Sequence, residues 1–184
     1  MRVITGSVKG KRLVALKGNR VRPTSDRVKE AFFNILGNKV VDSIFLDCFA
    51  GTGSIGIEAL SRGAKKCYFI DNHRESLAVI RENLHITNLL DRSKIIFKNS
   101  ISGIREVSSY HQKIDIIFLD PPYLKELIYP TLLTIIDSNI LHSSSLVIVE
   151  HSKKDVLKHQ HGLYCFEQRA YGNTVLSFFM REEN

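Results

Sequence analysis

The residues best suited to chemistry are Asp120-Pro121-Pro122-Tyr123, which directly follow a run of mostly apolar residues at 114–119. Proline lacks an N–H and keeps the preceding residue extended, so the backbone carbonyls here stay available as acceptors. The tyrosine adds a flat face that can stack on a base. We therefore expect this segment to hold a planar group that carries an amino nitrogen. The alternative is a plain turn at the end of a strand.

A glycine loop precedes this segment in the chain. Gly51, Gly53 and Gly56 match the pattern G-x-G-x-x-G between a strand and a helix, and Asp71 ends the next strand, where a carboxylate can bind ribose hydroxyls. A dinucleotide-dependent oxidoreductase has the same pattern. Asp47 at the loop entrance argues against a pyrophosphate and favours a cofactor that carries an ammonium or sulfonium group. A loop that serves packing alone is the other alternative.

The elements that must position these residues alternate between strand and helix. Near-continuous apolar strands separated by helices indicate a parallel sheet that is covered on both faces. The C-terminal end differs, because 163–170 and 174–181 flank Tyr171-Gly172-Asn173 and predict a β-hairpin. The expected strands are 43–48, 66–71, 94–97, 115–119 and 146–150, and the expected helices are 54–62, 74–87, a short helix or loop at 101–109, and 125–137.

Polar residues recur where these strands end. Asp47, Asp71, Asn99 and Asp120 lie at or just beyond four successive strand ends, and Glu150-His151 ends the last strand of the series. Ligands of doubly wound sheets bind outside the carboxyl ends of the strands. The sequence therefore predicts one site at this edge.

The basic charge is concentrated at the N-terminus. The net charge is +7, yet residues 1–40 hold ten Lys or Arg and two acids, whereas residues 41–184 are close to neutral. Such a segment suits a nucleic-acid backbone, although a solvated surface that aids solubility is the alternative. Its basic residues up to the first helix are Arg2, Lys9, Lys11, Arg12, Lys17, Arg20, Arg22, Arg27 and Lys29. Residues 2–20 are expected to form short strands paired as a hairpin, and an amphipathic helix over 28–36 is expected to anchor them.

Other classes are disfavoured by composition. A chain of 184 residues fits a domain at 41–184 with a small extension at 1–40, and no apolar run approaches a membrane span or a secretory signal. We expect a cytoplasmic monomer. Cys48, Cys67 and Cys165 show no metal or disulfide spacing and are expected to be reduced core residues, and the seven histidines match no ligand motif, so no metal is expected.

Four segments together resemble a known family. They are Arg2-Val3-Ile4-Thr5-Gly6, the run at 22–36, the loop at 46–53 and Tyr171-Gly172-Asn173-Thr174. The chain resembles class I S-adenosylmethionine-dependent methyltransferases of the Asp-Pro-Pro-Tyr amino-methylating type, in particular the bacterial 16S ribosomal RNA guanine-N2-methyltransferase family (RsmD-like). The resemblance implies an α/β Rossmann-like fold with a seven-stranded, mostly parallel sheet, a C-terminal antiparallel hairpin strand and a small N-terminal β/α extension.

The resemblance also implies roles for individual residues. S-adenosylmethionine would be the cofactor, and ribosomal RNA within a small-subunit particle would be the partner. Asn99 departs from the family, where many members carry Asp. The implied cofactor residues are Asp47, Gly51 and Gly53 at the methionine part, Asp71 at the ribose, Asn99 and Ser100 at the adenine, and Arg22, Pro23 and Thr24 over the cofactor. The implied catalytic residues are Asp120, Pro121, Pro122 and Tyr123, and the RNA-binding residues are Arg2, Lys9, Lys11 and Arg12.

Three other functions stay open from the sequence. Asp120-Pro121-Pro122-Tyr123 alone does not distinguish guanine N2 from adenine N6 in DNA or RNA as the methylated nitrogen. A non-catalytic RNA-binding or assembly protein on a Rossmann-like scaffold would need neither Asp120 nor Tyr123. An NAD-dependent oxidoreductase would use the glycine loop alone.

Overall fold

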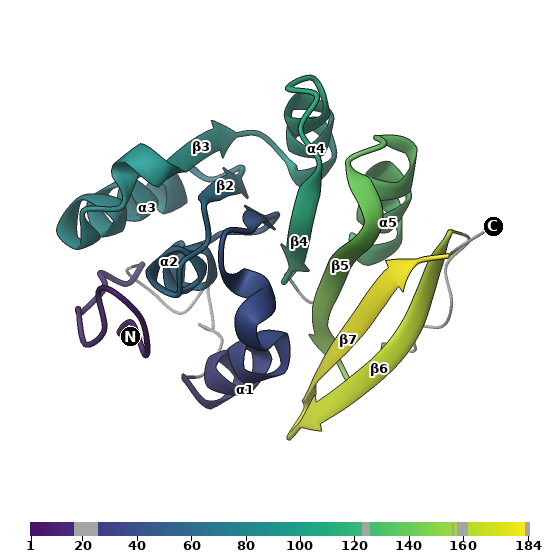
Figure 1. The fold of residues 1–184 in the computed structure, drawn as a ribbon, viewed down its shortest axis with the longest axis horizontal. Coiled ribbons are helices and arrows are strands. Elements are labelled where there is room, and N and C mark those ends of the chain that lie inside the picture. Colours follow the sequence, from purple (N-terminus) through teal and green to yellow (C-terminus); the bar gives the residue numbers. More distant parts are fainter. Residues whose placement is uncertain (17–25, 123–125, 156, 158–161, 183–184) are drawn as a thin grey trace.

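The fold is built on one seven-stranded sheet with helices on both faces (Figure 1). The computed structural model describes residues 1–16, 26–122, 126–155, 157 and 162–182. The strand order is β3-β2-β1-β4-β5-β7-β6. Strands β3 to β5 run parallel, β7 is antiparallel to β5, and β6 is antiparallel to β7. This confirms the predicted doubly wound sheet and its C-terminal hairpin.

Most element bounds agree with the hydrophobic pattern. The helix expected from residue 125 begins at Ile128, and Pro130 lies in its first turn, where a missing N–H removes no helical hydrogen bond. The strands are β1 (Ile44–Asp47), β2 (Lys66–Asp71), β3 (Ser93–Phe97), β4 (Ile114–Leu119), β5 (Leu141–Ser152), β6 (Leu163–Tyr171) and β7 (Thr174–Arg181). The α-helices are α1 (Asp26–Leu36), α2 (Ser54–Ser61), α3 (Arg74–Thr87), α4 (Ser100–Ser108) and α5 (Ile128–Asp137).

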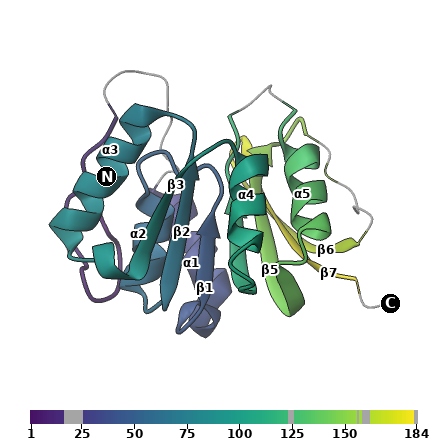
Figure 2. The same cartoon turned by 90° about the horizontal axis from the view of Figure 1, so that it is seen from above.

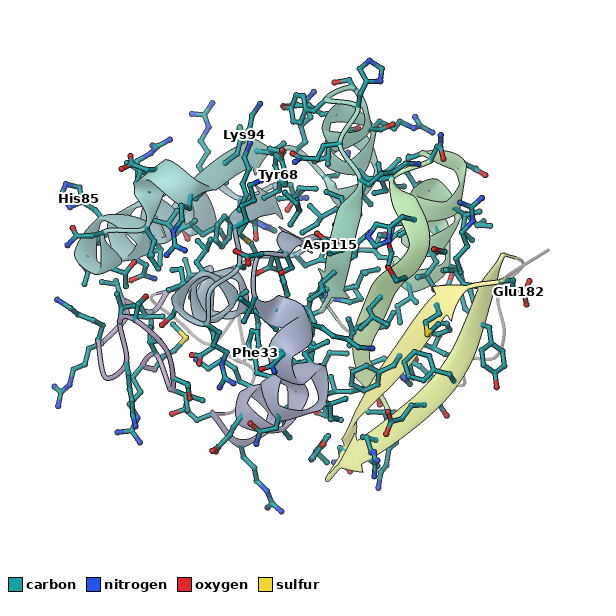
Figure 3. All side chains as sticks on the ribbon, in the orientation of Figure 1. Phe33, Tyr68, His85, Lys94, Asp115 and Glu182 are labelled. Carbon is teal, nitrogen blue, oxygen red and sulfur yellow. The ribbon has the colours of Figure 1, made fainter. Side chains whose placement is uncertain are left out.

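The helices divide between the two faces of the sheet. Helices α1, α2 and α3 pack on one face and α4 and α5 on the other, as Figures 1 and 2 show. Alternate residues of the central strands enter the two apolar clusters, because successive side chains of a strand point to opposite faces. Phe33 of α1 (Figure 3), for example, stacks on Phe45 of β1 with ring centroids 6.5 Å apart. The sheet edges are therefore the places where polar groups can gather.

Strand β5 begins five residues earlier than the apolar run predicts. Its first part is polar, and side chains rather than an apolar pattern hold it. Asp115 (Figure 3) accepts a 2.7 Å hydrogen bond from the Ile44 amide and pairs with His142 Nε2 at 2.9 Å. The Ser145 hydroxyl donates to the Ile114 carbonyl at 2.7 Å. This cluster ties β1, β4 and β5 together at the amino-terminal edge of the sheet, opposite the predicted site.

Residues 1–16 pack beside α2 and α3 (Figure 2). The strand pairing expected in this segment is limited to one antiparallel bridge between Arg2 and Arg12. Val3 and Leu13 are buried in the apolar cluster beneath it. The segment is thus anchored to the sheet domain by its own apolar side chains as well as by the backbone contacts described below.

The cysteines are free, as expected. Cys48 and Cys67 are buried, and burial raises the pKa of both thiols well above the usual value; Cys165 is half-buried. Within the described residues, no helix is both long and apolar enough to cross a membrane.

Candidate active site

The carboxyl ends of β2, β1 and β4 meet at one edge of the sheet. Asp47 ends β1 and lies in register with Phe69 of β2 on one side and Phe118 of β4 on the other. Beyond the strand, the Cys48 amide still donates to the Phe118 carbonyl and the Ala50 amide to the Ile70 carbonyl, each at 3.0 Å. The loop after β1 therefore starts between the carboxyl ends of β2 and β4. The strands that lead to Asp47, Asp71 and Asp120 thus end at one edge of the sheet, as the sequence predicts.

The glycines of the loop have different tasks. Gly53 precedes α2 with φ of 77°, in the left-handed region that suits glycine. Its amide donates to the Ala50 carbonyl at 2.7 Å, which closes the turn. A Cβ on Gly56 would lie 2.3 Å from the Phe69 ring and 2.6 Å from Cys67 Sγ. Gly56 therefore serves close packing of α2 on β2, so the third glycine of the pattern carries no information about the ligand.

Asp47 is a buried carboxylate with backbone partners. Its side chain is 2% exposed, and Oδ2 accepts a 3.3 Å hydrogen bond from the Gly56 amide. Burial raises the pKa of Asp47 to about 7, against the effect of the backbone hydrogen bonds, and the nearby Asp71 raises it further. No ion pair of the described residues includes Asp47. A buried carboxylate without a cation fits a positively charged ligand, which would stabilise its ionised form.

Asp71 is held against the glycine loop. Its Oδ2 accepts a 2.8 Å hydrogen bond from the Gly51 amide, and Oδ1 accepts a 2.9 Å bond from the His73 amide. The His73 ring lies 3.2 Å from the same oxygen, and the Asp71 side chain is 9% exposed. The carboxylate thus faces the loop with part of its surface open, which suits a neutral hydroxyl-bearing group.

Asn99 and Ser100 are engaged by their own helix and its neighbour. Asn99 is the N-cap of α4, where its Oδ1 accepts a 2.9 Å hydrogen bond from the Ser102 amide. The Ser100 hydroxyl is buried and lies 3.1 Å from the Thr131 hydroxyl of α5. The side chains of both residues are thus engaged within the protein, and their contact with an adenine stays a prediction.

Asp120 and the prolines follow β4 at the same edge. Asp120 is half-buried, Pro121 buried and Pro122 exposed. Leu119 pairs with Val149, so Asp120 comes one residue beyond the last paired position, beside Glu150 of β5. Tyr123 lies outside the described residues, as do Arg22, Pro23 and Thr24. Of the predicted catalytic segment, the structure therefore places three of four residues.

Glu150 and His151 differ from the expected strand end. Strand β5 continues to Ser152, and both residues are buried within its pairing with β7. His151 Nε2 lies 2.7 Å from the Ser177 hydroxyl, and burial lowers the pKa of the imidazole. His151 therefore belongs to the sheet interior. Among the described residues, no group of three potential ligands is placed to hold a metal ion.

The predicted RNA-binding residues are available to a partner. Arg2, Lys9, Lys11 and Arg12 are all exposed on the N-terminal segment. Lys29 is different, since it is fully buried and cannot reach a phosphate. Its Nζ donates to the Arg2 carbonyl at 2.8 Å and lies 3.6 Å from Glu58 Oε2, and burial lowers its pKa. Including Lys29 in the phosphate-binding segment was wrong.

Sequence reasoning missed the residues that anchor this segment. Glu58 is fully buried in α2, and its two oxygens accept hydrogen bonds from the Ile4 and Thr5 amides at 2.8 and 2.9 Å. The Arg62 Nε donates to the same carboxylate at 2.9 Å. A glutamate inside the otherwise apolar run Ser54-Ile55-Gly56-Ile57-Glu58-Ala59-Leu60 was the available signal, because charged groups are rarely buried without partners.

Comparison with known proteins gives a consistent result. The family described as "Conserved hypothetical protein 95" matches residues 1–180. The Bacillus subtilis protein "Putative rRNA methyltransferase YlbH" is 35% identical over 98% of this chain and 99% of its own length. "Ribosomal RNA small subunit methyltransferase D" of Escherichia coli is 34% identical over 82% of this chain and 74% of its own. A solved Escherichia coli structure, "Putative methyltransferase yhhF", superposes with a TM-score of 0.86 at 27% identity, covering 100% of this chain and 99% of that one.

The sheet order, the glycine loop and the acidic strand ends, together with these structural relatives, define a class I methyltransferase. Within that class, the chain belongs to the "Conserved hypothetical protein 95" family, and it is similar to the "Ribosomal RNA small subunit methyltransferase D" proteins of Haemophilus influenzae and Escherichia coli over most of their length.

Proposed function

We propose that the protein transfers a methyl group from S-adenosylmethionine to the exocyclic N2 amino group of a guanine in the 16S RNA of the small ribosomal subunit. One observation carries the proposal. Asp71, Asp47 and Asp120 end three adjacent strands, β2, β1 and β4, so a cofactor site and an acceptor for an amino group share one edge.

The cofactor assignment follows from the properties of the Asp47 and Asp71 carboxylates. The buried Asp47 suits the cationic amino acid end of the cofactor, and Asp71 suits the ribose hydroxyls. Gly51 and Gly53 have positive φ and no side chain, which would let the backbone of the loop approach the cofactor closely. A dinucleotide is a poorer fit, because its pyrophosphate would lie beside the buried Asp47 carboxylate. When bound, the cofactor would supply a methyl group on a positively charged sulfur, and the bond from that sulfur to the methyl group would break as the acceptor nitrogen takes the methyl, which leaves S-adenosylhomocysteine.

Asp120 would act on the amino group that receives the methyl. An aryl amine is a weak nucleophile because its lone pair is delocalised into the ring. The Asp120 carboxylate and the Pro121 carbonyl would accept its N–H hydrogens and let the nitrogen become pyramidal as the new N–C bond forms. The proton released by the product nitrogen would pass to Asp120 or to water. Positioning of this kind can supply up to about 7–11 kcal/mol, and a general base adds about 10²- to 10⁴-fold.

The RNA partner is supported by the relatives and by the basic segment. The Bacillus subtilis, Haemophilus influenzae and Escherichia coli relatives are named for methylation of ribosomal RNA, the last two for that of the small subunit. Arg2, Lys9, Lys11 and Arg12 are exposed on one segment that is fastened beside the glycine loop. A guanine inside a helix cannot reach the cofactor, so the target would be unpaired or flipped out at a cost of a few kcal/mol. We further propose that the protein acts as a cytoplasmic monomer on a small-subunit particle.

The test is labelled methyl transfer to small subunits that lack the modification, followed by nucleoside analysis of the 16S RNA. The expected product is N2-methylguanosine at one position. N6-methyladenosine would instead support the alternative base, and absence of transfer with intact RNA binding would support a non-catalytic binding protein. Stabilisation of the protein by NAD and not by S-adenosylmethionine would overturn the cofactor assignment.

A further inference from the structure

One buried side chain joins the basic segment to the glycine loop. Asn83, on α3, is fully buried. Its Oδ1 accepts a 2.7 Å hydrogen bond from the Val14 amide, and its Nδ2 donates to the Val14 carbonyl at 3.1 Å. The same Nδ2 donates to the Thr52 carbonyl at 2.9 Å. The amide thus pairs with Val14 as a neighbouring strand would, while it holds the loop with its second hydrogen.

The bond to Thr52 fixes one peptide plane of the loop. The peptide between Thr52 and Gly53 is held at both ends, since Asn83 binds its carbonyl and the Ala50 carbonyl accepts its N–H at 2.7 Å. Gly53 has a left-handed backbone that allows alternative orientations at low cost. Asn83 therefore selects one orientation of the loop against which the proposed cofactor would bind.

Other contacts of the segment lead elsewhere. Glu58 binds the Ile4 and Thr5 amides, and the Ser61 hydroxyl donates to the Thr5 carbonyl at 2.6 Å. Both side chains belong to α2 and hold the start of the segment. A weaker contact of 3.5 Å joins the Thr52 hydroxyl to Met1 Sδ. Asn83 is thus the strongest link that the described residues provide between the segment and the loop.

We propose that Asn83 is a positioning residue that couples RNA binding on the N-terminal segment to cofactor binding at the glycine loop. The inference rests on the proposed function, because it takes RNA as the ligand of the segment. RNA that binds the segment would stabilise the pairing of Val14 with Asn83, and with it the hydrogen bond from Asn83 to the Thr52 carbonyl. By linkage, RNA and cofactor would then raise each other's affinity by the same factor, commonly about 5- to 150-fold in coupled systems.

The test measures binding of tritiated S-adenosylhomocysteine by equilibrium dialysis, with and without saturating unmodified small subunits. For the wild-type protein, the subunits are expected to lower the Kd of the cofactor product at least about fivefold. Asn83→Ala should weaken binding of S-adenosylhomocysteine in the absence of subunits. In this variant the subunits should no longer lower the Kd, so the ratio of the two Kd values is about one. Val14→Pro removes the N–H that donates to Asn83 Oδ1 and leaves the Thr52 contact in place, so the product should bind alone as in wild type. The decrease in Kd caused by the subunits should be smaller than in wild type, because only the 3.1 Å bond to the Val14 carbonyl still joins the segment to Asn83.

The control is Ser61→Ala, which removes two hydrogen bonds of the same segment that do not reach the loop, one to the Thr5 carbonyl and one from the Val8 amide. This variant should keep the wild-type factor. The inference is overturned if the wild-type protein binds both ligands but the subunits leave the Kd of S-adenosylhomocysteine unchanged. It is also overturned if the subunits lower this Kd in Val14→Pro and Asn83→Ala as much as in wild type. Either result leaves the proposed function standing. Subunits that fail to bind the wild-type protein refute the proposed RNA partner and the coupling with it. Thermal melting of each variant shows whether it is folded. If Asn83→Ala is unfolded, Val14→Pro alone tests the coupling.

Discussion

The Asp71 carboxylate accepts a 2.8 Å hydrogen bond from the Gly51 amide, so the end of β2 and the loop after β1 are joined at one atom. Hydrogen bonds to a charged group contribute about 1.5–3 kcal/mol. Asp71 therefore holds the loop, and under the proposed function it would also bind the cofactor, so a substitution would remove both contributions together.

Removing the Asp71 carboxylate should weaken cofactor binding by more than the ribose contact alone. We expect Asp71→Ala to raise the Kd of S-adenosylhomocysteine about 10- to 100-fold. Calorimetry with an analogue that lacks the ribose hydroxyls separates the two tasks. The analogue should bind wild type more weakly than the parent compound, whereas Asp71→Ala should hardly distinguish the two ligands. Equal discrimination by both proteins would place the ribose elsewhere.

Cofactor affinity should depend on pH through Asp47. Its pKa without ligand is raised to about 7 by burial, and an ammonium group such as that of the ligand's amino acid end is bound by the ionised form. The Kd of S-adenosylhomocysteine should therefore rise up to about tenfold for each pH unit below 7 and level off above about pH 8. Calorimetry from pH 5.5 to 8.5 tests this, and a flat profile for the wild-type protein would contradict it.

Asp47→Asn is the matched variant for that experiment. It should bind the cofactor weakly at every pH and show no inflection near 7. It should also stabilise the ligand-free protein. The folded pKa of Asp47 lies above its usual value of 3.8, so ionisation removes stability as the pH rises from about 4 to about 7. The gain in Tm from the substitution should accordingly be larger at pH 8 than at pH 5.

The sequence predicted the central sheet and its acidic edge because both follow from local rules. Apolar strands mark β1, β2 and β4, and the chain must leave each strand at its carboxyl end, which brings Asp47, Asp71 and Asp120 together. The start of β5 could not be predicted in this way. Its polar residues are held by partners distant in the sequence, since His142 pairs with Asp115 and Ser145 donates to the Ile114 carbonyl.

The same limit applies to the N-terminal segment. Lys29 counts as a surface charge in any local reading, since Lys and Glu are rarely buried. Its burial depends on Glu58, which lies beyond β1 and satisfies two backbone amides at once. Asn83 is similar, because an amide in the middle of a helix gives no local sign that its partners are Val14 and Thr52. Residues that join distant segments require the three-dimensional structure.

Glu58 should be among the most costly residues to replace. Removing one partner of a buried, hydrogen-bonded charge pair typically costs about 3–5 kcal/mol, because the remaining groups stay buried without it. Glu58→Ala would leave Lys29 buried without its counter-charge and two backbone amides unsatisfied. We expect a loss of this size in urea unfolding. Glu82→Ala, an exposed position on α3, is the control and should change stability by less than about 0.5 kcal/mol. Similar losses for the two variants would argue against the anchoring role.

The basic segment should determine the salt dependence of RNA binding. Each phosphate contact contributes about 0.7–0.9 to the slope of log K against log salt concentration. Replacing Lys9, Lys11 and Arg12 with Ala should therefore lower the slope by about 2–3, measured by filter binding to unmodified small subunits. The matched control replaces Lys65, Lys94 and Lys113, which lie at the amino-terminal ends of β2, β3 and β4, opposite the proposed site. Lys29→Met should not change the slope, because Lys29 is buried. If the two triple variants have equal slopes of log K against log salt concentration, the basic segment does not bind RNA and instead serves solubility.

Replacing Asp120 should remove catalysis and spare the cofactor. Asp120 lies beyond β4, whereas the residues proposed for the cofactor follow β1 and β2. Asp120→Ala should lower kcat by about 10²- to 10⁴-fold while the Kd of S-adenosylhomocysteine changes less than about threefold. Asp120→Asn keeps one acceptor oxygen and cannot take up a proton, so it separates the two roles of the carboxylate. Turnover near the wild-type value in Asp120→Asn would assign Asp120 to positioning of the amine, and a loss as large as that of Asp120→Ala would assign it to proton removal. Wild-type turnover in Asp120→Ala would exclude it from the reaction.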